Sequence, residues 1–249
     1  MNIVNLLKNP KAYFLIAKKR IENSIRTVAF RGNNVVCEIC SWKGSRFFEG
    51  HCPKCNSLPR TRLIPFSLKH FKLTDNEPKI LHIAPNVNEY NYIKMHVTPL
   101  ANYDRLNIRH VSHINIVQDL TQTNLESHQY ELAIAWHVLE HIPEDVKAIK
   151  EVYRLLKPEG HFLVSVPIYP TGNAATIEDS SIPYIDFETV HGHYDHCRSC
   201  GLDYFERFEA IGFRTETLKV QDLKQEDINY FGLRTDHVVW CFTKPIHAV

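Results

Sequence analysis

The sequence predicts an α/β fold, with a doubly wound, mostly parallel seven-stranded sheet that follows a small N-terminal metal-binding unit. From residue 78 onward, apolar strand-like runs alternate with helical patterns, which is typical of a parallel sheet with helices on both faces. Two closely spaced cysteine pairs precede that region, in a segment too short for a hydrophobic core. The 249 residues, 44% hydrophobic and 23% charged, suit one large domain with such an appendage and exclude a largely disordered chain.

A basic helical segment is predicted for residues 1–34. Apolar residues recur there at intervals of three and four, which places them on one face of a helix: Phe14, Ala17, Ile21, Ile25 and Val28. Such a face either packs against the chain's own domain or lies on a membrane surface, and the sequence leaves both open. The first 72 residues hold 14 Lys and Arg against 3 acidic residues, a formal charge of +11, whereas the remainder carries −10. We therefore expect the N-terminal third to contact an anionic membrane surface, RNA or the acidic remainder itself.

Residues 35–58 contain the two cysteine pairs, and we predict that they form a zinc ribbon. The four thiols belong to Cys37, Cys40, Cys52 and Cys55. Each CxxC turn presents two sulfurs to one ion, so two turns complete a tetrahedral shell of four thiolates. Because this closed shell leaves no coordination position open, the expected metal is one structural zinc per chain.

Cysteine usage and the start of the chain both indicate a reducing compartment. Seven cysteines are an odd number, and tight CxxC pairs favour metal binding over disulfides. The N-terminus lacks the apolar stretch of a secretory signal, and no apolar run approaches the roughly 20 residues that span a bilayer. We expect a cytoplasmic protein, peripheral at the inner membrane face if the basic helix binds lipid. A further CxxC pair, Cys197 and Cys200, leaves a second metal site open.

Residues 59–249 are predicted to form the α/β domain, with an insertion at about 168–202 that covers the carboxyl edge of the sheet. The expected strands are 79–83, 100–103, 113–117, 131–136, 161–166, 213–220 and 237–243, and the expected helices are 60–73, 142–156 and 202–211. The hairpin-like ending predicts that the last strand runs antiparallel to the others.

The most specific motif of the chain is YELAIAWHVLEHIP at residues 130–143, followed by YRLLKPEGHFLVSVP at 153–167. These segments resemble the fourth- and fifth-strand motifs of class I S-adenosylmethionine-dependent methyltransferases of the type-11-like group. SLPRTRL at 57–63 and DHCRSCGLDY at 195–204 are similar to segments of a bacterial subgroup that carries an N-terminal zinc ribbon. The resemblance covers roughly residues 35–218.

This resemblance implies a cofactor site at the carboxyl ends of the strands, near the reversal of strand order. By position, it assigns contacts with S-adenosylmethionine to His82, Ala84, Asn86, Asp104, Asp119, Leu120 and Trp136. Asp104, taken as the end of the second strand, would accept hydrogen bonds from both ribose hydroxyls, and Asp119 with Leu120 would contact the adenine. Where the family has a glycine-rich loop, this chain has Ala84 and Pro85, whose small size and fixed φ still suit a tight turn.

Methyl transfer is an in-line displacement in which positioning contributes much of the rate and a base removes the proton of an alcohol. The candidate catalytic residues are His137, His141, Asp195 and His196. His137 and His141 are four residues apart and share a helix face, whereas Asp195 is expected to orient His196 as a base. A divalent ion held by Glu140, His141 and histidines of the insertion is an alternative, since the pattern partly resembles the ExxEH-like motif of some methyltransferases.

The function expected from these features is O-methylation of a hydroxyl on a glycan or lipid-linked sugar, which is a polysaccharide modification. One alternative is an RNA methyltransferase, whose ribbon would bind RNA through the interleaved basic and aromatic residues at 42–48. The other is a non-catalytic binding protein with a methyltransferase fold. The sequence leaves the methylated atom and the oligomeric state open.

Overall fold

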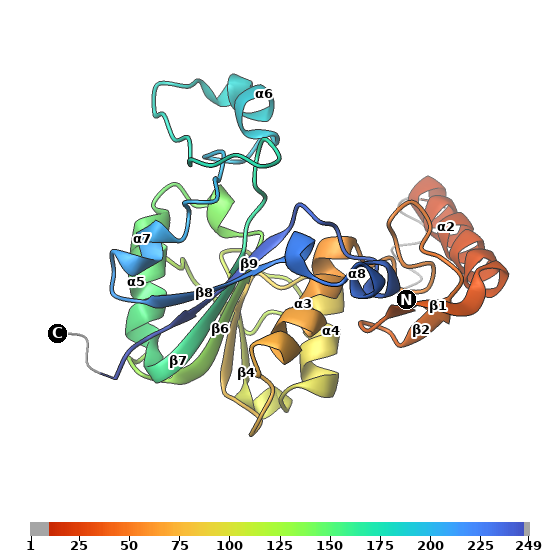
Figure 1. Ribbon diagram of the computed structural model, residues 1–249, viewed down its shortest axis with the longest axis horizontal. Helices are drawn as coiled ribbons and strands as arrows, with labels where there is room; N and C mark the ends of the chain where they lie inside the picture. The colour runs from red at the N-terminus through yellow and green to blue at the C-terminus, as the bar shows by residue number, and fades with distance from the viewer. Residues whose placement is uncertain (1–9, 247–249) are drawn as a thin grey trace.

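The computed structural model describes residues 10–246, and its centre is a seven-stranded sheet (Figure 1). The strands are β3 (Ile80–Ile83), β4 (Tyr103–Asn107), β5 (Ile116–Val117), β6 (Tyr130–Trp136), β7 (Leu156–Ser165), β8 (Arg214–Lys219) and β9 (Val238–Thr243). Their order across the sheet is β5-β4-β3-β6-β7-β9-β8, and β9 runs antiparallel to both of its neighbours. The predicted doubly wound, mostly parallel sheet with an antiparallel last strand is confirmed.

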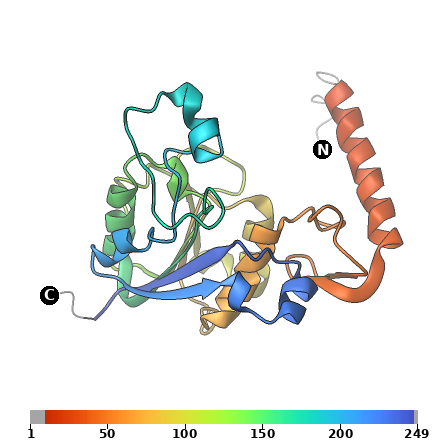
Figure 2. The same ribbon diagram turned by 45° about the horizontal axis from the view of Figure 1, so that its top comes forward.

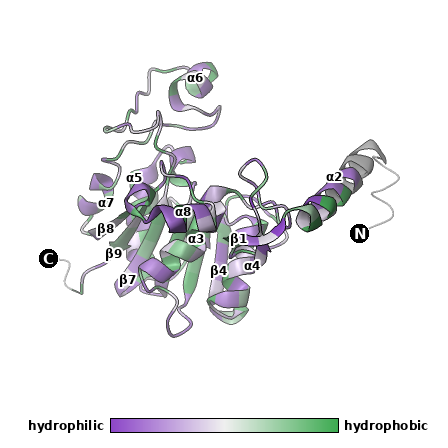
Figure 3. Ribbon diagram, turned by 45° about the vertical axis from the view of Figure 1, so that its right-hand side comes forward, coloured by the Kyte–Doolittle hydropathy of each residue, from purple (hydrophilic) through white to green (hydrophobic). Residues whose placement is uncertain are grey.

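Both faces of this sheet are buried, which explains why its central strands are almost continuously apolar. Along β6, Leu132, Ile134 and Trp136 belong to one core cluster, whereas Ala133 and Ala135 belong to the other. This alternation follows from the two-residue period of a strand. In Figure 3 the apolar strands lie between the helices of the two faces. The first face is covered by α3 (Pro59–His70), α4 (Val87–His96) and α8 (Gln225–Phe231), and the second by α5 (Asp145–Leu155) and α7 (Glu206–Glu209).

The N-terminal unit is an antiparallel pair of strands, β1 (Arg31–Cys37) and β2 (Trp42–Gly44). Arg62 of α3 joins this unit to the sheet domain. Its buried guanidinium donates to two carbonyls of the cysteine segment and to two at the end of α8. It also stacks on Phe47, 3.8 Å from the ring centroid. The second arginine of the SLPRTRL motif is therefore a structural anchor.

Helix α2 (Pro10–Ala29) projects from the body of the protein, as Figures 1 and 2 show. The exposed fractions of Ile21, Ile25 and Val28 are 61%, 63% and 67%, so the described residues do not cover this apolar face. At these three positions the helix does not pack against its own domain, although its last turns contact the ribbon through Arg26 and Phe48 and through Thr27 and Trp42. Residues 1–9 and the side chains of Phe14 and Ala17 lie outside what the structure describes. Within residues 10–246, no helix has the length and apolar character that crossing a bilayer requires.

Between β7 and α7 the chain makes a long excursion that contains α6 (Phe187–His191), the upper cyan segment of Figure 1. Arg198 fastens this excursion to the loop after β6. Its buried guanidinium donates to three carbonyls, those of Leu139, Ile142 and Pro143, and to the carboxylate of Glu178. The anchor brings the histidines that precede Arg198 close to the carboxyl edge of the sheet.

Candidate functional site

The four cysteines of the ribbon lie in the geometry of a metal site. Their sulfur atoms are all within 4.8 Å of one another, and the Cys37–Cys55 and Cys40–Cys52 sulfur pairs are each 3.7 Å apart. Four thiolates at about 2.3 Å around a tetrahedral zinc would be roughly 3.8 Å apart, so the residues present fit this ion. Cys197 and Cys200 join no cluster of three or more metal-ligating groups among the described residues.

A cavity of about 410 Å³ lies at the carboxyl ends of the central strands, and we call it the strand-end cavity. Its lining includes Ala84, Leu106, Asn107, Asp119, Leu120, His137, His141 and Ile142. The volume and the mixture of apolar walls with a few polar groups are those of a small-molecule site. Asp119 Oδ1 accepts two hydrogen bonds from Thr121, which lower the pKa of its carboxyl and leave Oδ2 without a bond from the described residues.

The structure brings some of the predicted cofactor residues into this cavity and leaves others outside it. Ala84, Asp119 and Leu120 line it, together with His137. His82 and Trp136 do not: both are buried in the sheet, where Trp136 donates to the Arg60 carbonyl. Trp136 therefore faces the core, and core packing alone accounts for its burial.

The expectation that Asp104 ends the second strand is wrong. Strand β4 begins at Tyr103 and ends at Asn107, because residues Leu100–Asn102 form a 3-10 turn before it. The Asp104 carboxylate accepts hydrogen bonds from Tyr130 and Asn115 and does not line the strand-end cavity. Asn107 is the polar residue that ends β4 at the cavity.

The loop after β3 turns without glycine. Ala84 adopts a φ of 48°, in the left-handed region that glycine normally occupies, and its amide donates to the Leu106 carbonyl. Asn86 does not line the cavity but caps α4, since its side chain accepts from the amide of Glu89. The capping box of α4 therefore fixes the far end of this turn.

Glu89 lies buried beneath this loop, with Oε2 3.7 Å from His82 Nε2. Burial raises the pKa of Glu89 to about 7 and lowers that of His82 to about 3. Both pKa shifts favour the neutral forms of the two side chains, so the contact between Glu89 and His82 is not an ion pair at neutral or mildly acidic pH. The folded protein binds the Glu89 proton more tightly than the unfolded chain does, so this group destabilises the fold progressively between pH 4.5 and 7.

Glu89→Gln is expected to remove this penalty while it keeps an acceptor for the Asn86 amide. The stability of the variant relative to the wild type should rise by about 3 kcal/mol between pH 4.5 and 7, and then level off. Urea unfolding at a series of pH values measures the difference. A difference that is constant over that range would show that Glu89 has an ordinary pKa.

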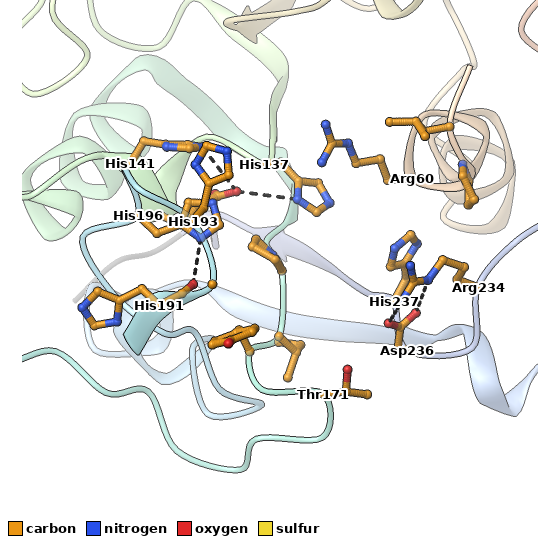
Figure 4. A pocket seen from close by; sticks show the side chains of 17 residues that line it. Arg60, His137, His141, Thr171, His191, His193, His196, Arg234, Asp236 and His237 are labelled. Carbon is orange, nitrogen blue, oxygen red and sulfur yellow. Dashed lines mark hydrogen bonds and ion pairs between the residues drawn. The ribbon is translucent and has the colours of Figure 1, made fainter. Parts of the chain in front are cut away.

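A second cavity of about 600 Å³ adjoins the first, and we call it the histidine cavity. His137 and His141 line both cavities. In Figure 4, His141, His193 and His196 form a group on one side, His137 lies centrally, and Arg234, Asp236 and His237 lie opposite. The predicted catalytic histidines are thus brought together where the two cavities meet, a place that we call the junction.

The pairing inside the histidine group differs from the expectation that Asp195 orients His196. Asp195 Oδ1 lies 3.1 Å from His141 Nδ1 and also contacts His193 Nδ1. His196 Nδ1 is instead 3.1 Å from the His191 carbonyl oxygen. The excursion turns between residues 193 and 196, so neighbours in sequence point to different partners. Burial opposes ionisation of Asp195, but His193 and His141 hold the pKa of its carboxyl below the usual range.

Glu140 supplies the buried charge of the junction. Its side chain is 1% exposed, with Oε1 3.6 Å from His137 Nδ1 and 3.8 Å from His141 Nε2. Burial acts to raise the pKa of Glu140, but the two histidines outweigh it and the pKa is lowered. A carboxylate beside His137 stabilises that imidazole as it gains a proton. His137 Nε2 is buried and has no partner among the described residues.

The opposite wall of the histidine cavity comes from parts of the chain that sequence reasoning left out of the site. Arg60 stands at the start of α3, and Arg234, Asp236 and His237 precede β9. Arg60 belongs to the SLPRTRL motif, which could have drawn attention to it. Residues 234–237 carry no local signal, because only the pairing of β9 with β7 brings them to the cavity.

Comparisons with known proteins agree with this fold. Residues 82–164, about a third of the chain, match the methyltransferase domain family. A solved S-adenosylmethionine-dependent methyltransferase from Mesorhizobium loti is 13% identical, with 72% of this chain and 96% of that one covered and a TM-score of 0.51. The corresponding enzyme from Archaeoglobus fulgidus is 13% identical, with 74% and 94% covered and a TM-score of 0.51. No match was found among curated proteins.

A third solved structure, the 1,6-didemethyltoxoflavin-N1-methyltransferase of Burkholderia thailandensis, was determined with S-adenosylhomocysteine bound. It is 13% identical, with 75% of this chain and 79% of that one covered and a TM-score of 0.50. The strand order and the strand-end cavity define the class I methyltransferase fold. Together with the family match over residues 82–164, this fold shows that the chain contains an S-adenosylmethionine-dependent methyltransferase domain.

Asp119→Asn is expected to weaken the binding of S-adenosylhomocysteine by about 10- to 100-fold, because it removes an anionic acceptor from the strand-end cavity. The asparagine oxygen still accepts from Thr121, so the loop keeps its shape. Asp104→Asn is the matched control and should leave the affinity unchanged, since Asp104 does not line the cavity. Calorimetric titration measures both. A larger loss in Asp104→Asn than in Asp119→Asn would restore the ribose role of Asp104.

Proposed function

We propose that this methyltransferase O-methylates a hydroxyl of a glycan or lipid-linked sugar at an anionic membrane surface. The observation that carries the proposal is the junction of the two cavities at His137 and His141. A cofactor in the strand-end cavity and an acceptor in the histidine cavity would meet there. The histidine cavity offers donors and acceptors from Arg60, Arg234 and Asp236, which suit a polyhydroxylated acceptor.

His137 is the group best placed to accept the hydroxyl proton. Its Nε2 has no partner among the described residues, and its Nδ1 faces the buried carboxylate of Glu140. S-adenosylmethionine, when bound, supplies an electrophilic methyl group on its sulfonium. Ala84, Asn107 and Asp119 would hold that cofactor, and the oxygen that loses its proton to His137 forms the new bond to carbon as the sulfur–carbon bond breaks.

The membrane part of the proposal rests on α2. Its exposed Ile21, Ile25 and Val28 form a continuous apolar face, and the helix sequence also contains five Lys and Arg against one Glu. A basic amphipathic helix of this kind lies in the plane of an anionic lipid surface. The formal charge of +11 over the first 72 residues acts in the same direction.

Flotation with vesicles tests the membrane contact. The full chain should bind vesicles that contain phosphatidylglycerol, bind neutral phosphatidylcholine vesicles more weakly, and dissociate as salt increases. Ile25→Glu should abolish binding, whereas Met95→Glu, a control at a 64% exposed position of α4, should not. Equal flotation of the two variants, or no flotation of the wild type, would contradict the membrane contact.

Transfer of a radiolabelled methyl group tests the acceptor. With labelled S-adenosylmethionine, the label should enter the lipid-linked sugar fraction of a bacterial membrane extract. Entry into RNA would instead support the alternative in which the basic ribbon binds nucleic acid. Absence of transfer to either fraction, with S-adenosylhomocysteine still bound, would favour the non-catalytic alternative.

A further inference from the structure

The junction of the two cavities contains a buried carboxylate that the protein leaves without a hydrogen bond. Glu140 is 1% exposed, and neither of its oxygens receives a hydrogen bond from the described residues. An anionic group in that position costs free energy unless a cation or a donor satisfies it. His137 and His141 approach it at 3.6 and 3.8 Å, distances too long for hydrogen bonds.

Two histidines beside Glu140 have their Nδ1 atoms already engaged. His141 Nδ1 lies 3.2 Å from the Asp195 carbonyl oxygen and 3.1 Å from its carboxylate. His196 Nδ1 lies 3.1 Å from the His191 carbonyl oxygen. Because Nδ1 donates in each case, the Nε2 atom of each ring keeps its lone pair. Histidines that bind metals are held in this way, with the second nitrogen donating to a carboxylate or a backbone carbonyl.

We propose that Glu140, His141 and His196 bind a divalent transition-metal ion at the junction of the two cavities. One ligand atom from each residue lies within 4.8 Å of the others, and the rings of His141 and His196 are 4.8 Å apart between centroids. Ligand atoms about 2.1 Å from one ion lie roughly 3–4 Å apart, so binding requires a side-chain movement on the order of 1 Å. Two imidazoles and one carboxylate favour zinc, cobalt, iron or manganese over magnesium or calcium.

The backbone holds this ligand set together across the sequence. The Cys197 amide, next to His196, donates to the Glu140 carbonyl oxygen at 2.8 Å. Arg198 then fastens the same segment to the carbonyls of Leu139 and Ile142, on either side of Glu140 and His141. The two halves of the site therefore stay in register although more than fifty residues separate them in the chain.

The role of the ion, though not its binding, rests on the proposed function. Glu140, His141 and His196 all line the histidine cavity, where the acceptor would lie, so an ion that they held would be within reach of the acceptor. Such an ion would lower the pKa of the acceptor hydroxyl, and His137 Nε2 would accept the proton. This route adds the charge stabilisation that an imidazole alone does not supply.

A second cluster shares His196 and is the alternative ligand set. It consists of His193, Asp195 and His196, again within 4.8 Å of one another. Its Asp195 and His193 are already paired with each other, and their side chains are 40% and 47% exposed. The set of Glu140, His141 and His196 contains the buried carboxylate that receives no hydrogen bond from the described residues, so we assign the ion to this set. The two sets differ at Glu140 and His193, which makes them separable by substitution.

The test is cobalt binding to the zinc-loaded full chain, after a mild chelator has removed weakly held ions. Calorimetry should show one cobalt per chain, with visible absorption that lacks the intense sulfur-to-cobalt band of a cysteine site. Glu140→Gln and His196→Gln should each weaken binding at least tenfold. His193→Gln and the exposed-surface control His128→Gln should leave it unchanged.

S-adenosylhomocysteine binding and thermal melting verify that each variant is folded, and Glu140→Gln keeps the side-chain volume. No cobalt uptake by the wild type, or unchanged uptake by both Glu140→Gln and His196→Gln, would overturn the site. Loss in His193→Gln with retention in Glu140→Gln would overturn this ligand set in favour of the exposed cluster. Cofactor binding by the wild type is measured independently, so failure of the metal site and failure of the proposed function are distinguishable.

Discussion

Cys52→Ser is expected to release the ribbon zinc and unfold residues 31–58. The Cys52 sulfur is buried and lies 3.7 Å from that of Cys40, so its loss breaks a closed shell of four thiolates. A structural zinc contributes on the order of 10 kcal/mol or more to a small domain of this kind, because binding and folding are coupled. Val35, Ile39 and Trp42 of the ribbon are buried in the core cluster that the sheet domain shares, so unfolding of the ribbon should also expose part of that cluster.

Metal analysis of the purified chain measures this prediction directly. The wild type should contain one zinc per chain, and Cys52→Ser should contain almost none. Cys197→Ser is the matched control and should keep its zinc, since its thiol contacts the His141 carbonyl and no cysteine of the ribbon. A wild-type protein with less than half an equivalent of zinc, or a Cys52→Ser variant that retains it, would contradict the assignment.

Unfolding of the ribbon should also disturb the wall of the histidine cavity that contains Arg60. The ribbon carbonyls that Arg62 binds hold the start of α3, and Arg60 lies in the same turn and lines the cavity. Unfolding of the ribbon would leave the buried Arg62 with half of its acceptors. Acceptor binding should therefore weaken more than cofactor binding, which takes place in the strand-end cavity.

His137→Asn is expected to lower kcat by about 10²–10⁴-fold, the contribution of a positioned base. His137 has a φ of 54°, and asparagine tolerates this left-handed conformation better than most residues do. The variant therefore removes the imidazole and keeps the backbone. Affinity for S-adenosylhomocysteine should fall as well, because His137 lines the strand-end cavity too.

His128→Asn is the matched control for this substitution. His128 also has a positive φ, of 60°, but it is exposed and lines neither cavity. Its kcat should remain that of the wild type. Single-turnover measurement of methyl transfer separates the chemical step from product release. Full turnover by His137→Asn would place the base elsewhere in the histidine group.

The mostly parallel α/β architecture and the cluster of four cysteines could be predicted because their signals are local. A CxxC turn brings its two sulfurs together whatever surrounds it, and the alternation of apolar strands and helices admits few sheet arrangements. The strand boundaries depend on turns that the sequence does not mark. Asp104 was expected at the end of β4 and lies near its start, because residues Leu100–Asn102 form a turn that their composition does not reveal.

Pairings inside the site could not be predicted from proximity in sequence. Asp195 and His196 are neighbours, yet Asp195 contacts His141 while His196 contacts the His191 carbonyl. A turn in the excursion points successive side chains in different directions, and long-range contacts of Arg198 fix that turn. The free energy of these contacts depends on atoms that are far apart along the chain, so it cannot be estimated from neighbouring residues.

The sequence by itself determined the mostly parallel α/β architecture and the cysteine cluster, because these follow from short-range spacing and periodicity, and the resemblance of residues 130–143 to a family motif placed His137 and His141 after the fourth strand. Only the tertiary structure decided which polar residues meet. It placed Trp136 in the core, brought Arg234 and His237 to the cavity through the pairing of β9, and left Glu140 buried without a hydrogen bond among the described residues. The physical reason is burial: whether a charge or an indole faces a ligand or the core depends on every element packed around it.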